Sequence, residues 1–170
     1  MIGYAGVQVL LPKLVEDEWH GGVGSYGLLF TLQGVGMVLG SIVLGQISAV
    51  RRRGVLIYGL LAVNNVLGIF LGLSPWFLGG ALVQVGRGFC VGFAITLWDT
   101  TVMQRVPQHM LSRVISLDWF GSLGLYPLGL GLWAFLSGLA PPGTLIAVSM
   151  ACCAFLFLLG LADPRIRELD

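Results

Sequence analysis

The stretch GMVLGSIVLGQISAVRRRG, residues 36–54, decides the class of fold. Residues 36–50 carry no charge, and Arg51 to Arg53 follow them directly. The uncharged part extends back to Val23, so the run 23–50 exceeds the roughly 20 residues that a helix needs to cross a bilayer. Because lipid offers no partners for unpaired backbone groups, such a run is expected to be helical. The stretch therefore predicts a membrane-spanning helix that ends in a basic loop.

The rest of the chain has the same character. Of its 170 residues, 56% are hydrophobic and only 10% are charged, whereas a soluble domain carries about 25% charged residues. So few charges cannot make a water-soluble surface. We therefore expect the lipid bilayer to surround the chain and to be its first partner. We predict an all-α membrane protein, a single domain over 1–170 with six helices, the first cut short. The expected helices are 1–12, 23–50, 54–73, 76–98, 114–136 and 144–161.

Arginines in the connecting segments predict the orientation. Lysine and arginine collect in loops on the cytoplasmic side of a membrane. If the runs cross alternately, Arg51 to Arg53, the polar link 99–113 and the tail with Arg165 and Arg167 share one side. The polar, acidic segment 12–22 lies in water on the other side. We expect a multi-pass protein of the cell (inner) membrane with its C-terminus in the cytoplasm.

Several classes of function are disfavoured. The net charge is +1 and the arginines are scattered, so no basic face for nucleic acid exists. Cys90, Cys152 and Cys153 lack histidine or acidic companions at ligand spacing, so neither a metal site nor a cofactor is predicted. The two histidines, His20 and His109, lie in polar segments, and no G-x-S-x-G motif occurs. We therefore do not expect a membrane protease or another enzyme.

Glycine accounts for 26 residues, and several stand one helical turn apart. In lipid, small residues at this spacing let two helix backbones approach closely. The simpler role of these glycines is helix packing. The alternative is that the closely packed helices also slide along each other during a conformational change. The residues expected to pack helices are Gly36, Gly40, Gly88, Gly92, Gly121, Gly124 and Pro127.

Arg87 stands at the centre of the run 76–98, where a charge costs several kcal/mol unless it faces a cavity or a partner. Asp99 is 12 positions further on, about 18 Å along a helix, and is too far to pair with it. Arg87 needs a counter-charge from another helix, from an absent part of the protein or from an anionic substrate. A structural tie to carbonyl groups is the alternative. Gln84, one turn earlier, and Gln33 complete the candidate substrate pathway.

The loop after the run 23–50 resembles the loop motif of the major facilitator superfamily. That motif is a glycine, a short spacer, an acidic residue and then basic residues around a tight turn. Gly45 matches the leading glycine, and Arg51, Arg52 and Arg53 match the basic cluster. The acidic position falls on Ala49, so the charge relay that the motif implies is incomplete.

A second stretch, MQRVPQHMLSRVISLDWFGSLGLYPLG, residues 103–129, is similar to the link between the tenth and eleventh helices in the macrolide-efflux and enterobactin-exporter branch of that superfamily. The resemblance implies that the chain spans the seventh to twelfth helices, with an N-terminal six-helix half as its partner. It also places Arg87 on the tenth helix, which lines the cavity in that family. The matching residues are Arg105, Pro107, Arg113, Val114, Pro127 and Gly129.

The resemblance implies half of a secondary transporter that exports a lipophilic drug or a siderophore-like small molecule by alternating access, with proton coupling. The alternative is a truncated, non-transporting membrane module that packs with a partner half or with itself. Asp118 is expected near the cytoplasmic start of the run 114–136. There it either complements the helix N-terminus or pairs with one of Arg51 to Arg53 to latch the inner gate.

Overall fold

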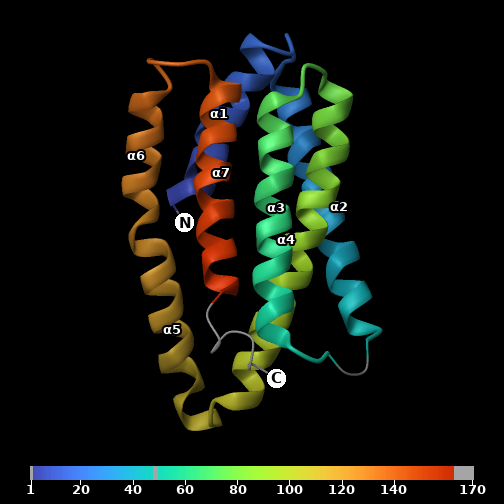
Figure 1. The fold of residues 1–170 in the computed structure, drawn as a ribbon, viewed down its shortest axis with the longest axis vertical. Coiled ribbons are helices and arrows are strands. Elements are labelled where there is room, and N and C mark those ends of the chain that lie inside the picture. Colours follow the sequence, from blue (N-terminus) through green and yellow to red (C-terminus); the bar gives the residue numbers. More distant parts are fainter. Residues whose placement is uncertain (1, 48–49, 163–170) are drawn as a thin grey trace.

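A computed structural model describes residues 2–47 and 50–162, and it is helical throughout apart from short connections (Figure 1). No strand occurs in these residues, which confirms the predicted all-α class. The helices are α1 (Ile2–Asp17), α2 (Val23–Gly45), α3 (Arg53–Leu73), α4 (Phe77–Arg105), α5 (Gln108–Gly124), α6 (Tyr126–Leu136) and α7 (Pro142–Leu161).

Five helical stretches of the described chain are long and apolar enough to cross a membrane: α2, α3, α4, α7, and α5 together with α6. The remaining helix, α1, has 16 residues and is about 24 Å long, which is short of a ~30 Å hydrocarbon core. The chain is therefore a multi-pass membrane protein.

The connections lie at two opposite ends of the bundle (Figure 1). The α2–α3 and α4–α5 connections lie together, and we call this the arginine end because Arg51, Arg52 and Arg105 are there. The α3–α4 and α6–α7 turns lie at the opposite end. The predicted grouping of the tail arginines, Arg165 and Arg167, lies outside the described residues.

The first predicted helix ends too early. Instead of stopping at Pro12, α1 continues to Asp17, so much of the segment expected to be a polar loop is helical. Leu14 and Val15 are 0% and 1% exposed, and their burial favours the helix although Pro12 has no N–H to donate. The outer part of α1 belongs to the core and not to the aqueous loop.

Two other predicted helix ends are also wrong. α2 ends at Gly45 instead of residue 50, and polar Gln46 forms its C-cap. α4 does not stop at residue 98 but runs to Arg105. Pro107 sets this end, because the residue before a proline is disfavoured in the helical conformation, and Val106 is indeed extended with φ −95° and ψ 128°. The predicted polar link is thus mostly helix.

The predicted run 114–136 consists of two helices. α5 begins directly after Pro107, and the chain breaks at Leu125 before α6. Pro127, at the start of α6, has no N–H, and its ring clashes with the carbonyl of the residue four positions earlier in a continuous helix. Pro127 is exposed, so it interrupts the helix and does not pack it against a neighbour.

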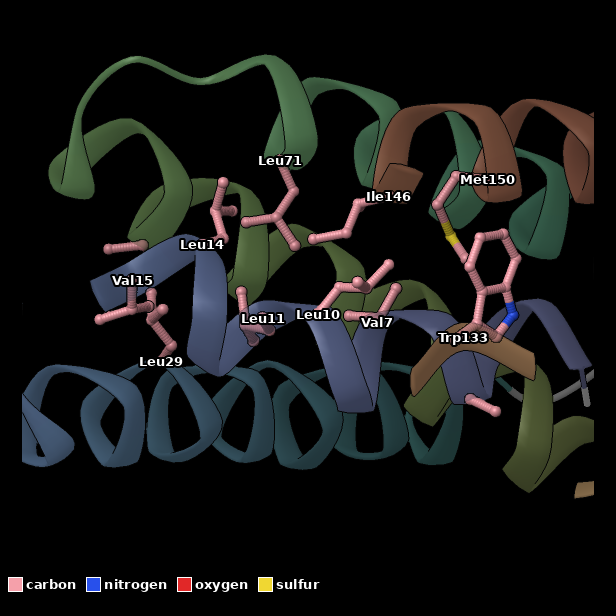
Figure 2. Close-up of a cluster of buried hydrophobic side chains, with 12 residues drawn as sticks. Val7, Leu10, Leu11, Leu14, Val15, Leu29, Leu71, Trp133, Ile146 and Met150 are labelled. Carbon is pink, nitrogen blue, oxygen red and sulfur yellow. The ribbon is translucent and has the colours of Figure 1, made fainter. Parts of the chain in front are cut away.

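The larger core is built around α1 (Figure 2). Side chains of α1 lie between α2 on one side and α3 and α7 on the other. Trp133 of α6 joins the same cluster, and its indole N–H donates a hydrogen bond to the carbonyl of Ile2 at 2.9 Å. The labelled residues are Val7, Leu10, Leu11, Leu14, Val15, Leu29, Leu71, Trp133, Ile146 and Met150. Side chains of α1 therefore form the centre of the larger hydrophobic cluster.

Candidate functional site

Four of the predicted packing glycines form one seam between α2 and α4. Gly36 and Gly40 come from α2, and Gly88 and Gly92 come from α4. A Cβ atom at any of these positions would overlap a backbone carbonyl oxygen of the facing helix. The two backbones are therefore in direct contact, which only glycine permits.

A second seam, between α3 and α7, was missed from the sequence. A Cβ at Gly72 would overlap the carbonyl oxygen of Gly143, and a Cβ at Gly143 would overlap that of Gly72. A Cβ at Gly68 would lie 2.6 Å from the Met150 side chain. Gly68 and Gly72 show the same four-residue spacing as the other seam, so the signal was present.

The expected packing is not found for Gly121 and Gly124. No atom lies within 4 Å of a Cβ built at either position, and no residue of α5 is buried in this structure. Large apolar side chains of α5 are exposed, Leu117 by 71% and Phe120 by 79%. Helical spacing alone does not say whether another helix faces the glycines.

Arg87 and Gln84 form a buried polar pair in the first half of α4. Arg87 is 1% exposed and Gln84 is 0% exposed. The guanidinium Nη1 of Arg87 donates a hydrogen bond to Gln84 Oε1 at 2.9 Å. Two donors of the pair, Arg87 Nε and Gln84 Nε2, have no partner among the described residues. No described carboxylate lies within ion-pairing distance of Arg87, so its charge is not matched by this part of the protein.

Neighbouring helices cover this pair. Ala81, one turn before Gln84, packs with the α1 cluster, which shows that this face of α4 looks toward the bundle interior. Gln33 of α2 is 7% exposed, and its backbone carbonyl lies against Gly88. The structure thus brings Gln84 and Arg87 together and places Gln33 on the facing helix.

The residues of the loop motif lie at the arginine end. Arg53 Nη1 donates to Gln104 Oε1 of α4 at 2.6 Å, which links the start of α3 to the end of α4. Arg52 has a left-handed backbone, with φ 55°, and Arg51 is exposed. Gly45 is also exposed, with open space around it. The acidic position of the motif, Ala49, lies outside the described residues.

Neither of the two roles predicted for Asp118 is found in the described residues. Because α5 begins at Gln108, Asp118 is well inside the helix and cannot complement its N-terminus. Its carboxylate accepts a hydrogen bond from Trp98 Nε1 of α4 at 3.3 Å, and it lines a cleft of about 90 Å³ with Trp98, Asp99 and Trp119. The structure therefore pairs Asp118 with an indole instead of with an arginine.

The sequence also gave no sign of a hydrogen-bond network at the opposite end. Three side chains near the C-terminal end of α1 bond to backbone groups of the α3–α4 turn, of the α6–α7 turn and of the first turn of α7. Such bonds join segments far apart in the chain, so no local spacing reveals them. The bonds are Lys13 Nζ to Ser137 O (2.5 Å), Trp19 Nε1 to Ser74 O (2.9 Å) and Gly143 N to Glu18 Oε1 (3.1 Å).

Comparison with known proteins gives one informative match. No family model matches the sequence, and no solved structure matches it. The enterobactin exporter EntS of Citrobacter koseri is 29% identical over 115 residues, which make up 65% of this chain and 26% of the exporter. The match thus covers about a quarter of that relative's length. The chain is therefore similar to part of an exporter, in agreement with the major facilitator resemblance of its two motifs.

Proposed function

We propose that the chain is half of a secondary transporter that exports a lipophilic drug or a siderophore-like small molecule by alternating access. The observation that carries the proposal is the Arg87–Gln84 pair, which is buried within a membrane-spanning helix and has unused donors. Charged groups at this depth typically mark substrate or ion pathways. The similarity to an exporter supports the same direction of transport.

The second half of the transporter is an N-terminal six-helix domain. In alternating access, two such halves rock about a substrate site near the bilayer midplane. The exposure of α5 in the isolated half is consistent with a surface that a partner covers. The arginine end faces the cytoplasm of the inner membrane, because basic loops remain on that side.

Export is coupled to proton movement through a residue of the other half. A proton carrier in a membrane is typically a carboxylate or a histidine within the spanning region. No described acidic residue lies beside Arg87, and Asp99 and Asp118 lie toward the arginine end. Arg87 itself does not exchange protons readily, because its guanidinium stays charged.

An efflux assay tests the function. The full-length protein is expressed in a bacterial strain that lacks its own drug and siderophore exporters. Retention is then measured for a panel of lipophilic antibiotics and of catecholate and hydroxamate siderophores. We expect at least one compound to leave the cells faster than in the empty strain, and a protonophore to abolish the difference. Equal retention of every compound in both strains would contradict the proposal.

The second candidate is a non-transporting module that packs with a partner half or with itself. It is favoured by α5, none of whose residues is buried and whose Leu117 and Phe120 side chains are largely exposed. The coding region upstream of Met1 distinguishes the two. A continuous reading frame with six further hydrophobic segments supports the transporter, whereas a separate start site supports the module.

A further inference from the structure

The buried pair on α4 has unused donors that a ligand could bind. A guanidinium has five N–H groups and no acceptor, and an amide has two N–H groups and one acceptor oxygen. The amide oxygen of Gln84 accepts one hydrogen bond from Arg87, which leaves the amide nitrogen turned away from the guanidinium as an unused donor. Arg87 Nε and Gln84 Nε2 are both buried and both unpartnered in the described residues.

Leaving this pair empty is unfavourable. Taking an ion out of water costs several kcal/mol, and only good geometry with an opposite charge compensates for that cost. The described residues supply no carboxylate within ion-pairing distance. Tyr4 of α1 is the ionisable side chain within electrostatic range of Arg87 among them, and its hydroxyl already accepts a hydrogen bond from Gln8 at 3.2 Å. A phenol hydroxyl is a hydrogen-bonding group and does not supply the formal negative charge that Arg87 lacks.

We propose that the transported molecule carries an oxyanion of the carboxylate class, and that Arg87 and Gln84 bind it. The inference rests on the proposed export function and names the substrate class of the same site. An oxyanion presents several acceptor lone pairs and one negative charge, which matches the unused donors and the charge of the pair. A guanidinium can hold two oxygens of such a group at once.

The first arm of the test measures stability without ligand. The full-length protein is purified in lipid nanodiscs as wild type, Arg87→Met and Arg113→Met, the last a control that removes the same charge from an exposed position on α5. If the counter-anion comes with the substrate, Arg87→Met removes an unmatched buried charge and raises the unfolding temperature above that of the wild type. The control variant should have the same unfolding temperature as the wild type.

The second arm measures binding with salicylate, a small lipophilic carboxylate, and salicylamide, its neutral match. Salicylate should raise the unfolding temperature of the wild type and of Arg113→Met. For the same rise, Arg87→Met should need at least a tenfold higher salicylate concentration. Salicylamide should have no effect on any of the three proteins. Because this assay involves no transport, failure of export in cells would leave its result intact.

Two results would overturn the inference. A lower unfolding temperature of Arg87→Met than of the wild type would place the counter-anion within the polypeptide, because the variant would then strand a buried carboxylate. Equal responses of the wild type to salicylate and salicylamide would show that the site does not recognise the charge.

Discussion

Arg87 Nη1 lies 2.9 Å from Gln84 Oε1, and both side chains are withdrawn from the molecular surface. The bond fixes the orientation of the amide, so that its nitrogen stays available as a donor. A charged group buried within a membrane-spanning helix is costly and typically functional. The first two expectations below follow from this pair and from the α2–α4 glycine seam, which includes Gly88 next to Arg87.

Replacement of Gln84 should destabilise the protein. Gln84→Leu removes the acceptor of Arg87 and leaves a further buried donor unpaired, which costs about 1–3 kcal/mol. The control is Gln104→Leu, which removes the acceptor of an exposed bond to Arg53 and should change stability by no more than roughly 0.5 kcal/mol. Thermal unfolding in detergent compares the two. Equal effects of both variants would contradict the special role of the buried pair.

Adding one methyl group to the α2–α4 seam should also be destabilising. Gly88→Ala places a Cβ against the Gln33 carbonyl oxygen, and overpacking of this kind costs about 1–3 kcal/mol. Gly34→Ala on α2 is the matched control, because nothing lies within 4 Å of its Cβ. Alanine is the better helix former, so the control should be neutral or slightly stabilising. An unfolding temperature of Gly88→Ala at or above that of Gly34→Ala would show that the seam is not closed.

The two ends of the bundle should face opposite sides of the membrane. A single cysteine is introduced at Arg51, at the arginine end, or at Leu139, in the turn at the opposite end, and both positions are exposed. A membrane-impermeant maleimide should label Leu139→Cys in intact cells and Arg51→Cys only after the membrane is opened. The unsubstituted protein provides the background from its own cysteines. Labelling of both variants in intact cells would refute the topology.

Much of the fold follows from the length of the apolar runs. The apolar runs 23–50, 54–73 and 144–161 are long enough that only membrane helices can satisfy their backbones. Helix ends were less predictable, because polarity does not stop a helix that still has packing contacts. α1 passes through Pro12 since Leu14 and Val15 are buried, and only Pro107 ends α4.

The candidate site was predictable in part. The three-residue spacing of Gln84 and Arg87 indicated a shared helix face, and the position of Arg87 within its run indicated membrane depth. Contacts between distant segments were not readable from local spacing. Gly88 and Gly121 belong to similar patterns, yet only Gly88 faces another helix in the described chain. The capping role predicted for Asp118 is wrong for a related reason, because α5 begins at Gln108, directly after Pro107, instead of at residue 114.

The most direct test of export through this site is the initial rate of efflux by the full-length Arg87→Ala variant, divided by that of Arg113→Ala at equal amounts of protein in the membrane. The compound is whichever one the wild type exports. If Arg87 holds the transported molecule, the ratio should fall to about one tenth or less, the equivalent of ~1.4 kcal/mol of lost interaction. A ratio near one would contradict the account.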